Sequence, residues 1–255
     1  WLHRKGIDYD IITDDELDRD GFHAVKNYQA IMTGSHPEYF TESMLDALLN
    51  YRESGGNLIY LGGNGFYWRI ARHLEDPSLL EIRRAEDGIR AWASEPGEYY
   101  NAFDGKYGGL WRRNARPPQK LVGVGFTAQG NFVGMPYKRI CFDKKLDWVF
   151  EGVHEKILGD FGLSGGGAAG FELDRVDSKL GGDQNITILA QSYDLDGKFM
   201  LVPEEQLTHL TNVSGEPEKN IKRADMVYFQ VPGGGRVFSV GSITFCGSLL
   251  SLIHI

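Results

Sequence analysis

The chain has 255 residues, of which 42% are hydrophobic, so it is long enough to bury one large core or a core with an added lobe. Its 27 Lys and Arg residues face 35 Asp and Glu residues, and the net charge of −8 argues against nucleic acid and anionic membranes as partners. No stretch reaches the roughly 18–20 apolar residues that a membrane-spanning helix needs, and no signal peptide is visible. We therefore expect a cytoplasmic protein with no nucleic acid and no membrane among its partners.

Strand and helix patterns alternate over the first 80 residues. Apolar runs predict short strands at Asp8–Ile12, Tyr28–Thr33 and Asn57–Leu61. Between the last two strands, Thr41 suits the N-cap of a helix over Glu42–Glu53, whose leucines recur at helical spacing. Strands and helices joined by short loops favour parallel strands with right-handed crossovers.

Residues 81–185 have a different composition and read as an inserted lobe. They are rich in glycine, proline, arginine and aromatic residues, with few clean helical periods. Glu81–Trp92 resembles strand and loop, and Asp147–Leu158 predicts a short helix. Strand patterns return after the lobe in four segments: Ile186–Gln191, Lys198–Val202, Ala224–Val231 and Arg236–Ile243. The core is therefore predicted to consist of residues 1–80 and 186–255.

The two ends of the chain suggest a piece of a longer polypeptide. Trp1 leads directly into a helix-like run, and the sequence closes on the apolar run Leu249–Ile255 without a polar or capping residue. We therefore expect the chain to be truncated at both ends.

Reactive side chains follow two of the predicted strands at the point where each strand ends. His36 and Glu38 come after the strand over Tyr28–Thr33, and Asn64 lies in a glycine turn after Asn57–Leu61. Ligands of an open parallel sheet bind at the carboxyl ends of its strands, so we expect these side chains to share one crevice. An imidazole, a carboxylate and an amide can there bind a metal, move a proton and stabilise an oxyanion.

Each of these residues also has a structural interpretation. A Gly-Gly-Asn-Gly segment is typical of a turn, and a single histidine at a strand end is often held by hydrogen bonds without acting chemically. Glu38 follows Pro37 and can cap the next helix. Their occurrence together at two successive strand ends favours the functional interpretation.

The segment Leu58–Trp68 resembles the nucleophile elbow of class I glutamine amidotransferases, which has the form Gly-x-Cys-x-Gly. The resemblance implies an α/β fold with a flavodoxin-like parallel sheet, carrying the inserted lobe. Gly63 stands in the place of the cysteine, so a cysteine–histidine mechanism is excluded at this position. If the protein cleaves amides, activated water is the expected nucleophile.

A more specific resemblance covers nearly the whole chain. Six segments carry it: Thr33–Tyr39, Tyr60–Trp68, Gly108–Arg112, Arg116–Gln119, Gly170–Arg175 and Gly241–Ile243. Together they resemble the C-terminal domain of the large, or beta, subunit of N,N-dimethylformamidase. The family implies hydrolysis of a small linear amide, assembly of identical subunits, and a small subunit as a further partner.

The resemblance also implies a mononuclear Fe(III) cofactor held by two tyrosines and one glutamate. Carried over by motif, the glutamate ligand is Glu38, and the tyrosine ligands are expected upstream of Trp1. Tyr9, Tyr39 and Tyr67 are substitutes within this chain. We therefore expect this chain by itself to lack a complete iron site. Hard carboxylate and phenolate oxygens suit Fe(III) better than thiolates do.

In the site that the resemblance implies, His36 and Asn64 line the cavity and Glu172 reaches in from the lobe, and the chemistry of these side chains suits catalytic roles. Glu172 would act as general base towards water, Asn64 would donate to the carbonyl oxygen or hold the nucleophile, and His36 would orient Glu38 or move a proton to the amine. A salt bridge to Arg175 is the structural alternative for Glu172. A second function stays open, a non-catalytic amidotransferase-like domain that binds a ligand or assembles a complex. A sugar hydrolase needs a marked acidic pair across a cleft, and no such pair stands out.

Overall fold

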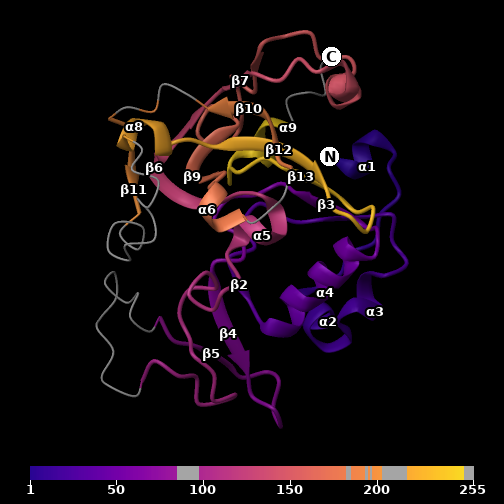
Figure 1. The fold of residues 1–255 in the computed structure, drawn as a ribbon, viewed down its shortest axis with the longest axis vertical. Helices are drawn as coiled ribbons and strands as arrows, with labels where there is room; N and C mark the ends of the chain where they lie inside the picture. The colour runs from indigo at the N-terminus through magenta and orange to yellow at the C-terminus, as the bar shows by residue number, and fades with distance from the viewer. Residues whose placement is uncertain (85–97, 182–184, 193–194, 196, 203–216, 250–255) are drawn as a thin grey trace.

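A computed structural model describes residues 1–84, 98–181, 185–192, 195, 197–202 and 217–249 (Figure 1). The later part of the predicted segment Glu81–Trp92 and most of Leu249–Ile255 lie outside the described residues. The helices are α1 (Leu2–Lys5), α2 (Asp14–Asp20), α3 (Phe22–Val25), α4 (Glu42–Glu53), α5 (Pro118–Val122), the 3-10 helix η2 (Lys144–Phe150), α6 (Ser178–Gly181), α8 (Glu218–Ile221) and α9 (Phe245–Leu249). The strands are β1 (Ala30–Met32), β2 (Tyr39–Phe40), β3 (Asn57–Tyr60), β4 (Trp68–Arg72), β5 (Leu80–Ile82), β6 (Gly125–Met135), β7 (Tyr137–Arg139), β8 (Ile157–Leu158), β9 (Ala169–Arg175), β10 (Thr187–Ser192), β11 (Phe199–Leu201), β12 (Asp225–Gln230) and β13 (Arg236–Ser239).

A seven-stranded mixed sheet forms the centre of the fold, in the order β1-β3-β13-β12-β10-β7-β8. The expected parallel arrangement is present in β1, β3 and β13, while the remaining neighbours are antiparallel. The pairing changes from parallel to antiparallel between β13 and β12. A tight turn over residues 231–235 joins these two strands, with a hydrogen bond from Val231 N to Gly235 O. Strands joined by so short a turn can only run in opposite directions.

The segment predicted as an inserted lobe contributes to this same sheet. Its strands β7 and β8 extend the sheet beyond β10. Its longer strands β6 and β9 pair with each other and with β11 in a second, three-stranded sheet. A third sheet contains β2, β4 and β5. The predicted boundary at residue 81 therefore does not separate the segment from the main sheet.

Two local predictions differ from the structure. Asp8–Ile12 is irregular rather than a strand, and Ile11 is 80% exposed, because no strand among the described residues pairs with this segment. The helix predicted over Asp147–Leu158 starts earlier, as η2, and β8 occupies the end of that range.

Apolar residues cover both faces of the central sheet. On β12, Val227 and Phe229 belong to one core cluster, and Met226 and Tyr228 belong to another. This alternation reflects the two-residue period of a strand and explains the continuous apolar run in the sequence. Figure 1 shows α2, α3 and α4 grouped on one side of the sheet, where α4 contributes to the first cluster.

Helix α4 starts as predicted and fixes the path of the chain between β1 and β3. The Thr41 hydroxyl accepts a hydrogen bond from Met44 N at 3.2 Å, which satisfies one of the free N–H groups at the helix start. Its buried face includes Leu45 and Leu48. No helix among the described residues is long and apolar enough to cross a membrane.

Candidate active site

Backbone hydrogen bonds join the loops that follow β1 and β3. Gly63 N donates to Ser35 O at 3.2 Å, and Phe66 N donates to Pro37 O at 2.7 Å. The two strands are parallel neighbours, so both loops leave the sheet at the same edge. This edge is where the sequence predicted a shared crevice.

The glycines of the second loop allow three segments to approach one another. A Cβ atom on Gly62 would lie 2.6 Å from Ser35 O. A Cβ atom on Gly63 would lie 2.6 Å from Glu172 O and 2.8 Å from Ile243 N. These gaps admit no side chain without a backbone shift. Strand β9 therefore closes against the turn, and position 63 has no room for a thiol.

The four predicted site residues meet at one nitrogen of His36. Its Nε2 atom lies 3.0 Å from Glu172 Oε2, 3.3 Å from Glu38 Oε2 and 3.3 Å from Asn64 Nδ2. The side chains of Glu38 and Glu172 are 16% and 10% exposed, and that of His36 is 35% exposed. The structure thus brings together an imidazole, two carboxylates and an amide at the surface of a largely buried cluster.

The charges of this cluster depend strongly on one another. A hydrogen bond with Glu172 raises the pKa of His36 against the effect of burial, and the charges of Glu172 and Glu38 raise it further. Burial raises the pKa of Glu38, while the charge of His36 and a hydrogen bond from Asn64 lower it. One imidazole faces two carboxyl groups at 3.0 and 3.3 Å, an arrangement in which a cation or a proton can offset negative charge.

Two further buried residues, Tyr60 and Asp174, bind the backbone of the turn that carries Asn64. Asp174 is wholly buried and accepts hydrogen bonds from Asn64 N at 2.7 Å and from the Tyr60 hydroxyl at 2.8 Å. The Tyr60 hydroxyl in turn accepts a hydrogen bond from Gly65 N at 2.8 Å. Burial raises the pKa of Asp174 to about 7, although these hydrogen bonds lower it.

The sequence contained a pattern that could have found Asp174. Glu172 and Asp174 are two residues apart on β9, and residues at that spacing in a strand lie on the same face. Two acids on one face of a mostly apolar strand are unusual in a core. Tyr60 had no comparable pattern, because a tyrosine in a strand is ordinarily a core residue.

The alternative salt bridge for Glu172 is not formed. Arg175 pairs with Asp177, at 2.9 Å between Nη2 and Oδ2, and Glu172 pairs with His36. Of the three tyrosines considered as iron ligands, Tyr39 has a hydrogen bond with Glu38 and a pKa raised mainly by burial.

The donor set agrees in kind with a hard cation such as Fe(III). Glu38 and Glu172 offer carboxylate oxygens from side chains that are largely buried. Within the part of the chain that the structure describes, no group of three or more His, Cys, Asp or Glu side chains is arranged to hold a metal ion. We therefore assign Glu38 as one candidate ligand and no complete set.

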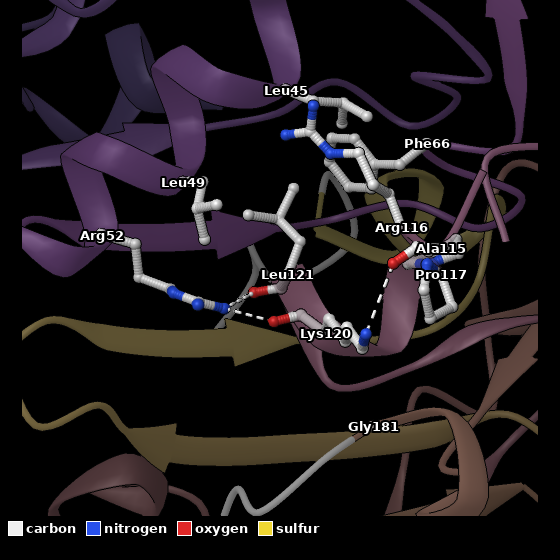
Figure 2. A pocket seen from close by; sticks show the side chains of 11 residues that line it. Leu45, Leu49, Arg52, Phe66, Ala115, Arg116, Pro117, Lys120, Leu121 and Gly181 are labelled. Carbon is white, nitrogen blue, oxygen red and sulfur yellow. Dashed lines mark hydrogen bonds between the residues drawn. The ribbon is translucent and has the colours of Figure 1, made fainter. Parts of the chain in front are cut away.

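A separate cavity of about 380 Å³ lies between α4 and α5 (Figure 2). Figure 2 shows Arg52 reaching from α4 to the carbonyl groups of Lys120 and Leu121, with hydrogen bonds of 2.6 and 2.7 Å. These bonds satisfy carbonyls near the end of α5. None of the four predicted site residues lines this cavity.

Fold and site together define an α/β protein with a carboxylate- and imidazole-lined site at the ends of parallel strands. Comparison with known families makes this class specific. The chain belongs to the family of N,N-dimethylformamidase beta subunit-like C-terminal domains, which matches residues 1–254.

Two curated relatives agree with this assignment. The chain is 39% identical to the N,N-dimethylformamidase beta subunit of Paracoccus aminophilus and 38% identical to that of an Alcaligenes species, in both cases over 98% of this chain. The chain spans 33% of the length of each relative.

Proposed function

We propose that this chain forms part of the active site of a hydrolase that cleaves a small linear amide such as N,N-dimethylformamide. The names of the two relatives point to this substrate class. The observation that carries the proposal is the meeting of Glu38, Glu172 and Asn64 at the His36 imidazole. Glu38, an acid whose pKa burial raises, lies beside an imidazole at the ends of parallel strands, and such an arrangement is typical of catalytic sites.

Glu38 is the residue of this chain that would hold Fe(III). When bound, the ion would polarise the amide carbonyl and lower the pKa of water. Buried beside Glu172, Glu38 has a raised pKa, so a cation would stabilise its charged form.

Glu172, His36 and Asn64 would carry the proton and hydrogen-bond steps. Glu172 would accept a proton from the attacking water as its oxygen bonds to the amide carbon. Its contact with His36, at 3.0 Å, offers a path by which a proton reaches the amine as the C–N bond breaks. The Asn64 amide would donate a hydrogen bond to the carbonyl oxygen as negative charge develops there.

The environment of Cys246 supports water as the nucleophile. Cys246 donates to Leu61 O at 3.4 Å, and burial raises the pKa of its thiol. A thiol that is protonated and hydrogen-bonded in this way is a poor nucleophile. Gly63 leaves no room for a thiol at the turn itself.

Glu38→Ala in the natural full-length polypeptide tests the proposal. We expect stoichiometric iron and a phenolate-to-Fe(III) band in the unmodified protein, with turnover of a small amide. The variant should lose iron and at least about 1000-fold in kcat, and its far-UV circular dichroism should stay unchanged. The matched control is Glu75→Ala, an exposed acid, which should keep both properties.

Retention of iron and turnover by Glu38→Ala would remove Glu38 from the metal site. An unmodified protein that is colourless, free of metal and inactive on amides would instead favour a non-catalytic domain that binds a ligand or assembles a complex. Because both relatives are named as subunits, we also propose assembly with further copies and with a smaller subunit. Light scattering of the purified protein measures this.

A further inference from the structure

The turn that carries Asn64 has a strained backbone. Asn64 and Phe66 have positive φ angles of 51° and 55°, and Phe171, next to Glu172, has one of 59°. Asparagine tolerates this region, but for a bulky residue such as phenylalanine it costs roughly 1 kcal/mol or more. Strained residues persist where surrounding contacts hold them, so the turn needs partners that fix its backbone.

The fixing contacts come from one buried pair. Asp174 Oδ1 accepts from Asn64 N, and Asp174 Oδ2 accepts from the hydroxyl of Tyr60. The same hydroxyl accepts from Gly65 N. Two successive N–H groups of the turn are therefore held by a carboxylate and a phenol that are both fully buried.

The pair reaches the site through Asn64. Its backbone N–H is bound by Asp174, while its side-chain Nδ2 lies 3.3 Å from His36 Nε2. Asp174 lies on β9, two residues after Glu172, so the turn is held from this strand. Moving the Asp174 carboxyl would move the Asn64 amide relative to His36.

We propose that Asp174 and Tyr60 are positioning residues, which hold the left-handed turn and thereby place the Asn64 side-chain amide opposite His36. This inference rests on the proposed function for its effect on turnover. Neither residue touches the cluster at His36 through its own side chain, so their contribution passes through Asn64. A misplacement of about 1 Å can lower a rate by about 100-fold.

Asp174→Asn and Tyr60→Phe test the proposal in the natural full-length polypeptide. Asparagine keeps the shape of Asp174 but has one acceptor oxygen for two donors, and phenylalanine removes the acceptor of Gly65 N. We expect kcat to fall about 10- to 100-fold with KM changed less than threefold. The matched control is Tyr137→Phe, a fully buried tyrosine whose hydroxyl donates to Val240 O at 2.6 Å, and its kcat should be unchanged.

A double-mutant cycle separates positioning from general destabilisation. In an Asn64→Gly background the side-chain amide is absent, so Asp174→Asn should lower kcat no further. An equal additional loss in that background would overturn the proposal.

Amide hydrogen exchange gives a second readout that needs no turnover. Protection of Asn64 N–H or of Gly65 N–H should fall in Asp174→Asn, because one acceptor oxygen cannot serve both Asn64 N and the Tyr60 hydroxyl. Protection of Gly65 N–H should fall in Tyr60→Phe, with neither amide changed in Tyr137→Phe. Unchanged protection at both amides would also overturn the positioning role. If the unmodified protein cleaves no amide, the proposed function fails while exchange still decides whether this pair holds the turn.

Discussion

Two buried aspartates show how differently one protein can accommodate a charge. Asp225 on β12 accepts hydrogen bonds from Arg223 Nε at 2.9 Å, Gln191 Nε2 at 2.8 Å and Val176 N at 2.8 Å. Asp174 on β9 is equally buried, but the donors found for it among the described residues, Asn64 N and the Tyr60 hydroxyl, are neutral.

The surroundings of the two carboxylates explain the difference. Asp225 has a cation beside it, so its charge is balanced within the fold. Burial is the main cause of the raised pKa of Asp174; the charge of Glu172 raises it further, and the charge of His36 lowers it. A fold gains nothing by gathering like charges in its interior. The cluster around His36 is therefore better explained by function than by stability.

Substitution of Asn64 tests the functional side of this comparison and should have the largest effect. Asn64→Gly and Asn64→Ala both remove the side-chain amide, and we expect kcat to fall about 100- to 1000-fold with little change in KM. Glycine suits the φ of 51°, whereas alanine does not, so Asn64→Ala should also unfold more easily.

Steady-state kinetics on a small amide and urea denaturation measure the two effects of Asn64 separately. If Asn64→Gly kept the kcat of the unmodified protein, the amide would have a structural role, and the site would resemble the Asp225 cluster after all.

Substitution of Arg223 tests the structural side. Arg223→Met would leave the Asp225 carboxylate buried without its cation, and we expect the free energy of unfolding to fall by about 3 kcal/mol. The kcat of the folded protein should not change. Arg236→Met, an exposed arginine on β13, should change stability by less than about 0.5 kcal/mol. A loss of kcat in folded Arg223→Met would show that the two clusters are not independent.

The sequence predicted those parts of the fold whose patterns are local. Helix α4 begins at its predicted Thr41 cap, and β12 and β13 lie within the predicted strand segments Ala224–Val231 and Arg236–Ile243. The strands β7 and β8 are three and two residues long, too short for a period to emerge, so their place in the main sheet was missed.

The candidate site likewise contains residues that the sequence predicted and a contact that it did not. His36, Glu38 and Asn64 come together because each follows a strand of a parallel pair, and the family motif adds Glu172. The Asp174–Tyr60 bond joins residues 114 positions apart, and no local pattern reports on such a contact. A buried carboxylate becomes recognisable only when the donors around it are known.

The pH dependence of stability offers the finest test of the comparison. The pKa of Asp174 in the folded protein is about 7, above the value of roughly 3.9 for an unfolded aspartate. Between about pH 4 and pH 7, Asp174 therefore holds a proton in the folded protein but not in the unfolded chain. The stability that this proton contributes is fully present below about pH 4 and is lost as the pH rises towards 7.

Urea denaturation of the unmodified protein and of Asp174→Asn measures this contribution by difference. From pH 5 to pH 7, the free energy of unfolding of the unmodified protein should fall relative to that of the variant, by up to about 1.4 kcal/mol per pH unit. Above pH 7 the difference should become constant. Parallel curves over the whole range would mean that Asp174 is ionised in the folded state throughout. Its neutral donors would then stabilise a buried charge as well as Arg223 stabilises Asp225, and the contrast between the two aspartates would disappear.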